Sequence, residues 1–500
     1  MHSVSKFLGK RLAFVLSTTF TLIAFSGNGA WALDLSEDHY ELKLLGKYVF
    51  FDKISEPSRM ACSTCHDPET GWTGSVSGVN LHQVAIAGAN AHTRGQLKPP
   101  SNAYASLIPP FEIFGGEPGE KLGGNFWDGR AEGNAPPAEF PLGAEKHIGD
   151  EVFQGIGGGD PTDYILEYAA YFGGTADQAL NPMPNSVEQN IDRQSVCRHV
   201  ETTKYSELYV EAWGQPINCS DDEVLIRAAD VESEKQYDIS FKRLMLAVCA
   251  WQHSAEVNSF SSRRDLALAS DGDGEFPLDD FTDQENLGHD LFYNLTSALN
   301  PDPDGSSGPL RAKRANCRFC HRSGNRDGTS IDERYTDDEY KNIGTPVNFE
   351  IPGVFEPAPG LAGHTGDTLE TGLHKTPTLR NVDKRKDNDF IKAYAHNGWF
   401  KSLESLVHFY NTADVDGDTA TSFNVVRCPE DVTTEKDALA LNCWPAPAVE
   451  EGSSVGGIVG DLGLTLEEEA ALVAYLKTFT DTVTPTAPKP YKSATSGKKR

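Results

Sequence analysis

The spacing of apolar side chains along the chain predicts mainly helices. Apolar residues dominate Ile239–Phe260, as in a long and largely buried helix. Near the C-terminus, Thr465 and Glu468 form a capping box. It precedes a stripe of apolar side chains at helical spacing, Leu472, Val473, Leu476 and Phe479. Few segments alternate like strands, and 46 Gly and 29 Pro favour loops. We therefore expect a mostly α fold with long loops.

A third amphipathic helix is predicted over Ser402–Asn411. Its apolar positions recur at i, i+3, i+4 and i+7, namely Leu403, Leu406, Val407 and Tyr410. Tyr410 therefore points inward with the apolar face, whereas His408, about 100° past Val407, turns away.

Residues 1–32 have the pattern of a secretory signal peptide. Three cations, a mostly apolar run and a small-x-small site follow one another: Lys6, Lys10 and Arg11, then Leu12–Phe25, then Ala30-Trp31-Ala32. No other stretch reaches about 18 uninterrupted apolar residues, so we expect no integral membrane span in the mature chain. An uncleaved N-terminal anchor is the alternative. Cleavage would leave 468 of the 500 residues, exported to the periplasm.

The charge of the chain limits its partners. With 44 Lys and Arg against 73 Asp and Glu, the net charge is -29, which loss of residues 1–32 would take to -32. Such a chain repels phosphate backbones, so a nucleic-acid partner is not expected. A cationic protein partner suits it better.

One five-residue pattern with reactive side chains occurs twice: Cys62-Ser63-Thr64-Cys65-His66 and Cys317-Arg318-Phe319-Cys320-His321. Cys-x-x-Cys-His is the attachment site of c-type haem, because two thiols at this spacing reach the vinyl groups while the imidazole reaches the iron. A redox dithiol would need a βαβ surround, and zinc would need a second ligand pair close by; neither is present. We predict two covalently bound c-type haems on Cys62, Cys65, Cys317 and Cys320, with His66 and His321 as iron ligands.

The other five cysteines have structural roles. Cys197 with Cys219, and Cys428 with Cys443, are close in sequence and lie in polar segments, which predicts two local disulfides. Cys249 lies in an apolar run and is expected to be a buried free thiol.

The sequence before each haem motif repeats. Leu45–Phe51 and Leu287–Tyr293 share Leu-Gly, three variable positions and two aromatic residues. Two related cytochrome c-like haem domains follow, divided near residue 270 by the polar stretch Ser270–Glu275. We therefore expect an N-terminal domain over 33–270, a C-terminal domain over 271–482 and a flexible tail over 483–500.

The function depends on the sixth ligand of each iron, because an iron filled on both faces passes electrons whereas an open one binds a small oxidant. Methionine is the usual high-potential partner. The four methionines stand at 1, 60, 183 and 245, and none follows the second motif. Tyr410 is the replacement that we predict for the second haem, with a core tyrosine as the alternative.

At these residues the chain resembles the bacterial di-haem cytochrome c peroxidases and their relative MauG, which oxidises tryptophan side chains of a partner protein. The resemblance covers most of the mature chain. Its markers, beside the two haem motifs, are Leu45–His66, Asn125–Ala131, the helix ending near Phe260, Asn342–Pro346, Lys375–Val382 and Tyr394–Tyr410.

The resemblance implies roles for several residues. The family's high-potential haem takes Met in peroxidases and Tyr in MauG, after a His-x-Gly turn that is His396-Asn397-Gly398 here, and the matching residue is Tyr410. Trp127 matches a tryptophan between the haems, which implies an electron relay; a core tryptophan is the alternative. The first haem, on His66, would be the peroxide site.

The chain also departs from the family at the peroxide site. Pro137 replaces a glutamine, and His147 stands where peroxidases have a catalytic glutamate, with Glu145 two residues earlier. Glu145 or His147 could move protons there, unless both lie in a solvated loop. In peroxidases a histidine caps this iron at rest; His82 and His92 are the candidates, and since neither aligns we expect an open pocket.

A calcium ion between the domains is a further implication of the family. Its Thr-x-Pro ligands are replaced here by Ile391 and Ala393, so only backbone carbonyls remain for a calcium ion. The expected substrate is hydrogen peroxide, with electrons from a small protein such as a cytochrome c or a cupredoxin. The alternatives are MauG-like oxidation of a substrate protein and a non-catalytic di-haem electron carrier.

Overall fold

The computed structural model describes residues 38–492, except 116–118, 134–147, 154, 157–163, 165–166, 226–232, 296–314, 354–356, 416–422 and 457. The predicted signal peptide, residues 1–32, lies outside the described residues. Asp38–Arg500 forms one compact unit.

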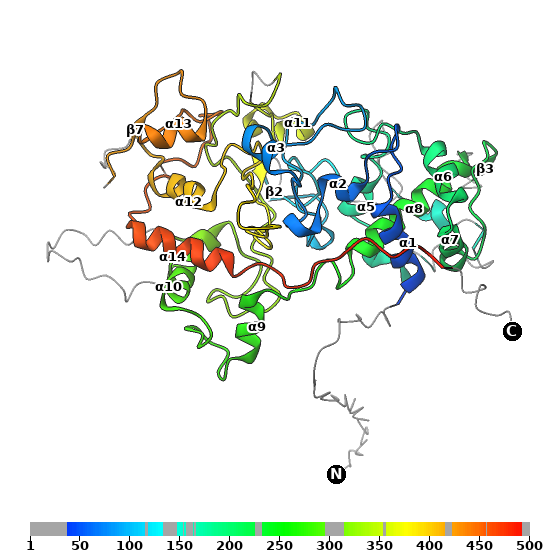
Figure 1. Ribbon diagram of the computed structural model, residues 1–500, viewed down its shortest axis with the longest axis horizontal. Helices are drawn as coiled ribbons and strands as arrows, with labels where there is room; N and C mark the ends of the chain where they lie inside the picture. The colour runs from blue at the N-terminus through cyan, green and yellow to red at the C-terminus, as the bar shows by residue number, and fades with distance from the viewer. Residues whose placement is uncertain are drawn as a thin grey trace, which may run out of the picture. The chain divides into compact units, whose positions relative to one another are not determined.

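The described chain is mostly helical, which confirms the predicted fold class at this level (Figure 1). The helices are α1 Tyr40–Phe51, α2 Cys62–Cys65, α3 Ser77–His82, α5 Gly174–Ala179, α6 Arg193–Thr202, α7 Ser206–Trp213, α8 Gln236–Gln252, α9 Arg263–Ser270, α10 Asp283–Tyr293, α11 Ala362–Thr365, α12 Leu403–Thr412, α13 Glu435–Ala440 and α14 Leu466–Lys477. Short strands form four two-stranded pairs: antiparallel β1 Glu112–Phe114 with β2 Glu120–Leu122, β3 Glu223–Leu225 with β4 Ser233–Lys235 and β5 Tyr340–Lys341 with β6 His374–Lys375, and parallel β7 Val426–Arg427 with β8 Cys443–Trp444.

The repeat seen in the sequence forms two equivalent helix pairs (Figure 1). Helix α1 packs on α8, and α10 packs on α14. Gly46 of α1 lies against the carbonyl of Ala247, and Gly288 of α10 lies against the carbonyl of Ala471, so closely that a β-carbon at either glycine would overlap the oxygen. The Leu-Gly pair is therefore repeated because each helix crossing needs a residue without a side chain.

Two large hydrophobic cores accompany these helix pairs. The first takes its buried residues from Leu42 to Val257, and the second takes its buried residues from Ala267 to Phe479. Each core contacts the first cysteine of one haem motif, Cys62 or Cys317.

Helix α8 is shorter than its apolar run. The helix was expected over Ile239–Phe260, but it begins at Gln236 and ends at Gln252. Asn258 explains the ending, because its side-chain amide donates to the carbonyl of Gln252 (3.0 Å) and its oxygen accepts from the backbone of Tyr104 (2.6 Å). A local hydrogen bond to Gln252 and a tertiary one from Tyr104 thus take the place of the last helical turns.

The C-terminal helix and the disulfides agree with the sequence. The capping box of Thr465 and Glu468 begins α14. The two predicted disulfides, Cys197–Cys219 and Cys428–Cys443, are both formed. Cys249 is a buried free thiol, as predicted.

After α14 the chain runs in an extended conformation and returns to α1 (Figure 1). The hydroxyl of Tyr48 donates to the carbonyl of Lys489 at 2.6 Å, and the rings of Tyr48 and Tyr491 meet edge to face. The flexible tail over 483–500 stays a prediction, and residues 493–500 lie outside the described residues. Among the described residues, none of the helices combines the length and the apolar composition of a membrane span.

Candidate haem sites

The two Cys-x-x-Cys-His motifs fold alike. Cys62–Cys65 forms α2, and Cys317–Phe319 forms a 3₁₀ turn. In each motif the backbone N–H of the histidine donates to the carbonyl of the first cysteine, at 3.0 Å for His66 and 2.9 Å for His321. None of the four cysteines is in a disulfide. Each motif therefore presents two thiols and one imidazole from a single turn.

Both imidazoles are oriented in the same way. Nδ1 of His66 lies 3.1 Å from the carbonyl oxygen of Trp72, and Nδ1 of His321 lies 3.0 Å from that of Tyr335. Both carbonyls come from residues with left-handed backbone, at φ 65° and 57°. Because a carbonyl only accepts, Nδ1 carries the proton, and Nε2 keeps the lone pair that an iron ligand needs.

The same residues are held in the protonation states that suit this role. Burial lowers the pKa of His66 and of His321 to about 4, so both imidazoles are neutral. Burial also raises the pKa of Cys62 to about 11 and that of Cys65, Cys317 and Cys320 to about 12. These are protonated thiols, unlike the acidic thiols of redox-active dithiols.

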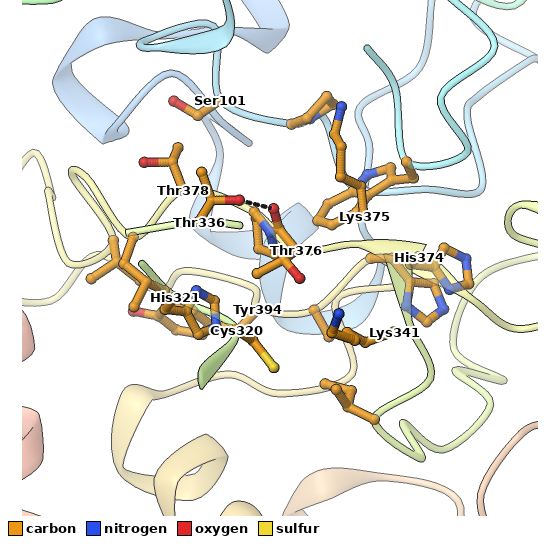
Figure 2. A pocket seen from close by; sticks show the side chains of 18 of the residues that line it. Ser101, Cys320, His321, Thr336, Lys341, His374, Lys375, Thr376, Thr378 and Tyr394 are labelled. Carbon is orange, nitrogen blue, oxygen red and sulfur yellow. Dashed lines mark hydrogen bonds between the residues drawn. The ribbon is translucent and has the colours of Figure 1, made fainter. Parts of the chain in front are cut away.

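One cavity connects the two motifs. It is lined by His66, Trp127, His321 and Tyr410 among others. Figure 2 shows one part of it, with His321 and Cys320 on one side and His374 and Lys375 of β6 across from them.

The residues around the cavity fit haem. Its walls are largely apolar, as a porphyrin requires. Three buried polar atoms of described residues that line it have no hydrogen-bond partner: His374 Nε2, Asn316 Oδ1 and Thr345 Oγ1. Buried polar groups are normally paired, so these atoms indicate a missing polar partner such as the propionates of haem.

Helix α12 places Tyr410 as its amphipathic pattern predicted. The cavity is lined by all four residues of the predicted face, Leu403, Leu406, Val407 and Tyr410. His408 turns away and lies 3.0 Å from a carboxylate oxygen of Glu469. Burial, followed by the neighbouring Cys320 and Cys317, raises the pKa of Tyr410. Tyr410 thus lines the same cavity as Cys317 and Cys320, and Tyr410 and Cys317 pack against the same core.

Trp127 is fixed by backbone contacts from both parts of the chain. Its indole Nε1 donates to the carbonyl of Lys98 (2.8 Å), and its own carbonyl accepts from the backbone N–H of Lys375 (2.9 Å). Trp127 is only 8% exposed. The ring also meets that of His396 edge to face, with centroids 6.4 Å apart.

The cavity is also lined by residues for which the sequence predicted no role. His374 and His396 stack with centroids 3.5 Å apart and planes 6° apart. Burial lowers the pKa of Lys98 and of Lys375 to about 8. His396 and Lys375 stand in motifs that resemble the family, but only the fold brings them beside Trp127.

The remaining predicted residues are not at the cavity or not described. His82 is exposed at the end of α3 and lies 3.3 Å from Glu350, and His92 is exposed as well. Neither lines the cavity. Glu145 and His147 lie outside the described residues, as does Pro137.

The fold and the cavity together fit a haem protein with two Cys-x-x-Cys-His motifs on one cavity. Residues 41–273 match the family model of the di-haem cytochrome c peroxidases. The methylamine utilization protein MauG of Paracoccus denitrificans (strain Pd 1222) is 26% identical over 450 residues, 88% of each chain. MauG of Methylophilus methylotrophus is 22% identical over 374 residues, 74% of this chain and 72% of that protein. The predicted resemblance to the di-haem cytochrome c peroxidase and MauG family is thereby confirmed.

Solved structures share the fold. The diheme peroxidase BthA from Burkholderia thailandensis E264 has a TM-score of 0.56 at 23% identity, over 91% of this chain and 90% of that chain. A MauG-like protein associated with microbial copper homeostasis has a TM-score of 0.52 at 21% identity, over 88% and 90%. The family implies two haems and an oxidoreductase of the peroxidase type.

Proposed function

We propose that this protein is a periplasmic di-haem oxidoreductase that reduces hydrogen peroxide at the first haem with electrons relayed from the second. The observation that carries the proposal is that His66, Trp127 and His321 line one cavity. In the proposal, thioether bonds on the four motif cysteines attach the haems, and His66 and His321 bind the irons through Nε2.

When bound, the haem irons supply the redox chemistry, in which hydrogen peroxide takes up two electrons and two protons and leaves as two waters. The protein orients both imidazoles through the carbonyls of Trp72 and Tyr335. These hydrogen bonds raise the basicity of the ligands and fix their tautomer.

Trp127 is the proposed electron relay between the two sites. Its indole N–H is held by Lys98, and its backbone is held by Lys375. These contacts keep the ring in one orientation relative to both motifs, which suits a relay.

Peroxide is proposed to enter the part of the cavity next to the haem that His66 would hold. The positions of His82 and His92, which do not line the cavity, support a pocket that is open at rest. Glu145 or His147 is the proposed proton carrier there, since the reaction consumes protons.

Tyr410 is the proposed second ligand of the second iron. Its support is its place on the cavity beside Cys317 and Cys320. A phenolate ligand stabilises oxidised iron, so this haem would hold an oxidising equivalent better than a methionine-bound one.

We also propose two cytochrome c-like domains, over 33–270 and 271–482. The separation of the two cores between Val257 and Ala267 supports a boundary in this region. Export through a cleaved signal peptide belongs to the same proposal, because c-type haem is attached outside the cytoplasmic membrane.

MauG-like oxidation of a partner protein is the second candidate. Tyr410 on the cavity and the similarity to two MauG proteins favour it. In the first candidate the partner is instead a small electron donor, a cytochrome c or a cupredoxin. Both partners would meet an acidic chain, with a net charge of -29 over the whole sequence.

Electron paramagnetic resonance of the resting oxidised holoprotein, followed by peroxide turnover with reduced cytochrome c, tests the proposal. We expect one high-spin and one low-spin haem, and sustained oxidation of the donor. An oxidised state that persists without turnover would favour the MauG-like function. Two low-spin haems that do not respond to peroxide would identify an electron carrier and contradict the proposal.

A further inference from the structure

A buried lysine stands between the two residues that match the family's calcium ligands. Lys392, between Ile391 and Ala393, is only 3% exposed. Its Nζ donates to the carbonyl oxygens of Thr70 (2.7 Å), Lys384 (2.9 Å) and Asn381 (3.4 Å). An ammonium group has three N–H donors, so the three carbonyls match it in number.

These carbonyls come from two distant parts of the chain. Thr70 closes the 3₁₀ turn Pro68–Thr70 just after the first haem motif, whereas Asn381 lies within the motif Lys375–Val382 and Lys384 follows that motif. Lys392 therefore ties the loop of the first haem motif to the second half of the chain, as a bridging cation would.

The backbone of Ile391 is engaged as well. Its carbonyl accepts from the side-chain amide of Asn80 (2.8 Å), and its N–H donates to the hydroxyl of Ser77 (3.1 Å). The carbonyl of Ile391, which we expected to be available to a metal, thus faces an N–H donor.

The charges around Lys392 do not suit a divalent cation. Burial, followed by Lys98, Arg385 and Lys384, lowers the pKa of Lys392 well below its usual value, whereas Asp383 and the three carbonyls that accept from Nζ favour its charged form. The nearby carboxylate of Asp383 is bound by the guanidinium of Arg385, at 2.7 and 3.0 Å. Calcium takes six to eight oxygen ligands, usually with carboxylates among them. No group of three His, Cys, Asp or Glu in the described chain could hold a metal.

We propose that the Nζ group of Lys392 replaces the interdomain calcium ion of the family, and that this protein joins its two halves without calcium. The proposal rests on the contacts of Lys392 and is independent of the reaction proposed above.

Metal content and thermal unfolding of the holoprotein test it. After dialysis against EGTA, we expect no stoichiometric calcium by elemental analysis, and the same Tm and haem absorbance with EGTA or with added CaCl2. Lys392→Met removes the three donors and should lower Tm by about 5 °C with or without calcium. Lys477→Met is the matched control, because Lys477 is 45% exposed and pairs only at the surface with Glu404; its Tm should change by less than about 1 °C.

One calcium ion per wild-type chain, whose removal by EGTA lowers Tm, would overturn the proposal. A Lys392→Met protein with unchanged Tm would overturn it too. If that variant does not fold, the metal content and EGTA response of the wild type decide alone.

Discussion

His408 and Tyr410, two residues apart on α12, point to different surroundings. The imidazole of His408 lies 3.0 Å from Glu469, whereas the phenol of Tyr410 lines the cavity beside Cys317 and Cys320. Two residues correspond to about 200° around a helix, so the two side chains leave α12 on different sides, and only the tyrosine lines the cavity.

Replacing Tyr410 tests this ligand directly. We expect Tyr410→Met to change the absorbance spectrum of one haem and to raise its reduction potential, because thioether sulfur favours reduced iron more than phenolate does. The spectrum of the other haem should not change. His408→Gln is the control and should leave both spectra unaltered. The ligand assignment fails if Tyr410→Met leaves both spectra as they were.

Trp127→Phe tests the electron relay. Phenylalanine keeps the packing but is much harder to oxidise, so we expect the rate of peroxide turnover to fall by at least about tenfold while both resting spectra are retained. Trp399→Phe is a matched control, since Trp399 is also buried but does not line the cavity. Equal rates of peroxide turnover in the two variants would contradict the role of Trp127 as the electron relay.

The helix crossings make a prediction about stability. Gly46→Ala places a methyl group on the carbonyl of Ala247, and we expect it to destabilise the protein by about 2–3 kcal/mol, seen as a lower Tm. Gly272→Ala is the control, because a β-carbon there meets no atom within 4 Å. If both substitutions lower Tm equally, the close packing of Gly46 in α1 against α8 would be contradicted.

His289 predicts a pH dependence of stability. The residue is 0% exposed and stacks on Phe276 with ring centroids 3.4 Å apart. Burial lowers its pKa, although Asp290 opposes the shift. The pKa of a histidine in the unfolded chain is about 6.5. As pH falls below this value, the unfolded chain binds a proton at His289 that the folded chain does not bind, so the free energy of unfolding decreases.

Thermal unfolding between about pH 7.5 and about pH 5.5 checks this effect. The wild type should lose stability on acidification, and His289→Gln should lose less over the same range. A steeper loss in the variant would contradict the assigned sign.

Local patterns were sufficient to predict the features that depend on neighbouring residues. The helical face of Tyr410, the capping box at Thr465 and both disulfides follow from spacing along the chain. The end of α8 did not, because the hydrogen bonds of Asn258 to Tyr104 and Gln252 are set by tertiary packing.

The cavity also contains contacts that local sequence patterns could not predict. His374 and His396 are 22 residues apart in the sequence, and no periodicity relates them, yet their rings stack at 3.5 Å. Likewise, the contact between Lys392 and the carbonyl of Thr70 could not be predicted from the sequence, because only the fold brings the two residues together.

The intact mass of the exported protein, produced in a host that matures c-type cytochromes, shows whether two haems are covalently attached to the chain. We predict a mass equal to the polypeptide without residues 1–32 plus two haem groups that survive denaturation, and plus one haem when Cys317 and Cys320 are both changed to Ala. A denatured protein with the mass of the polypeptide alone would contradict the account.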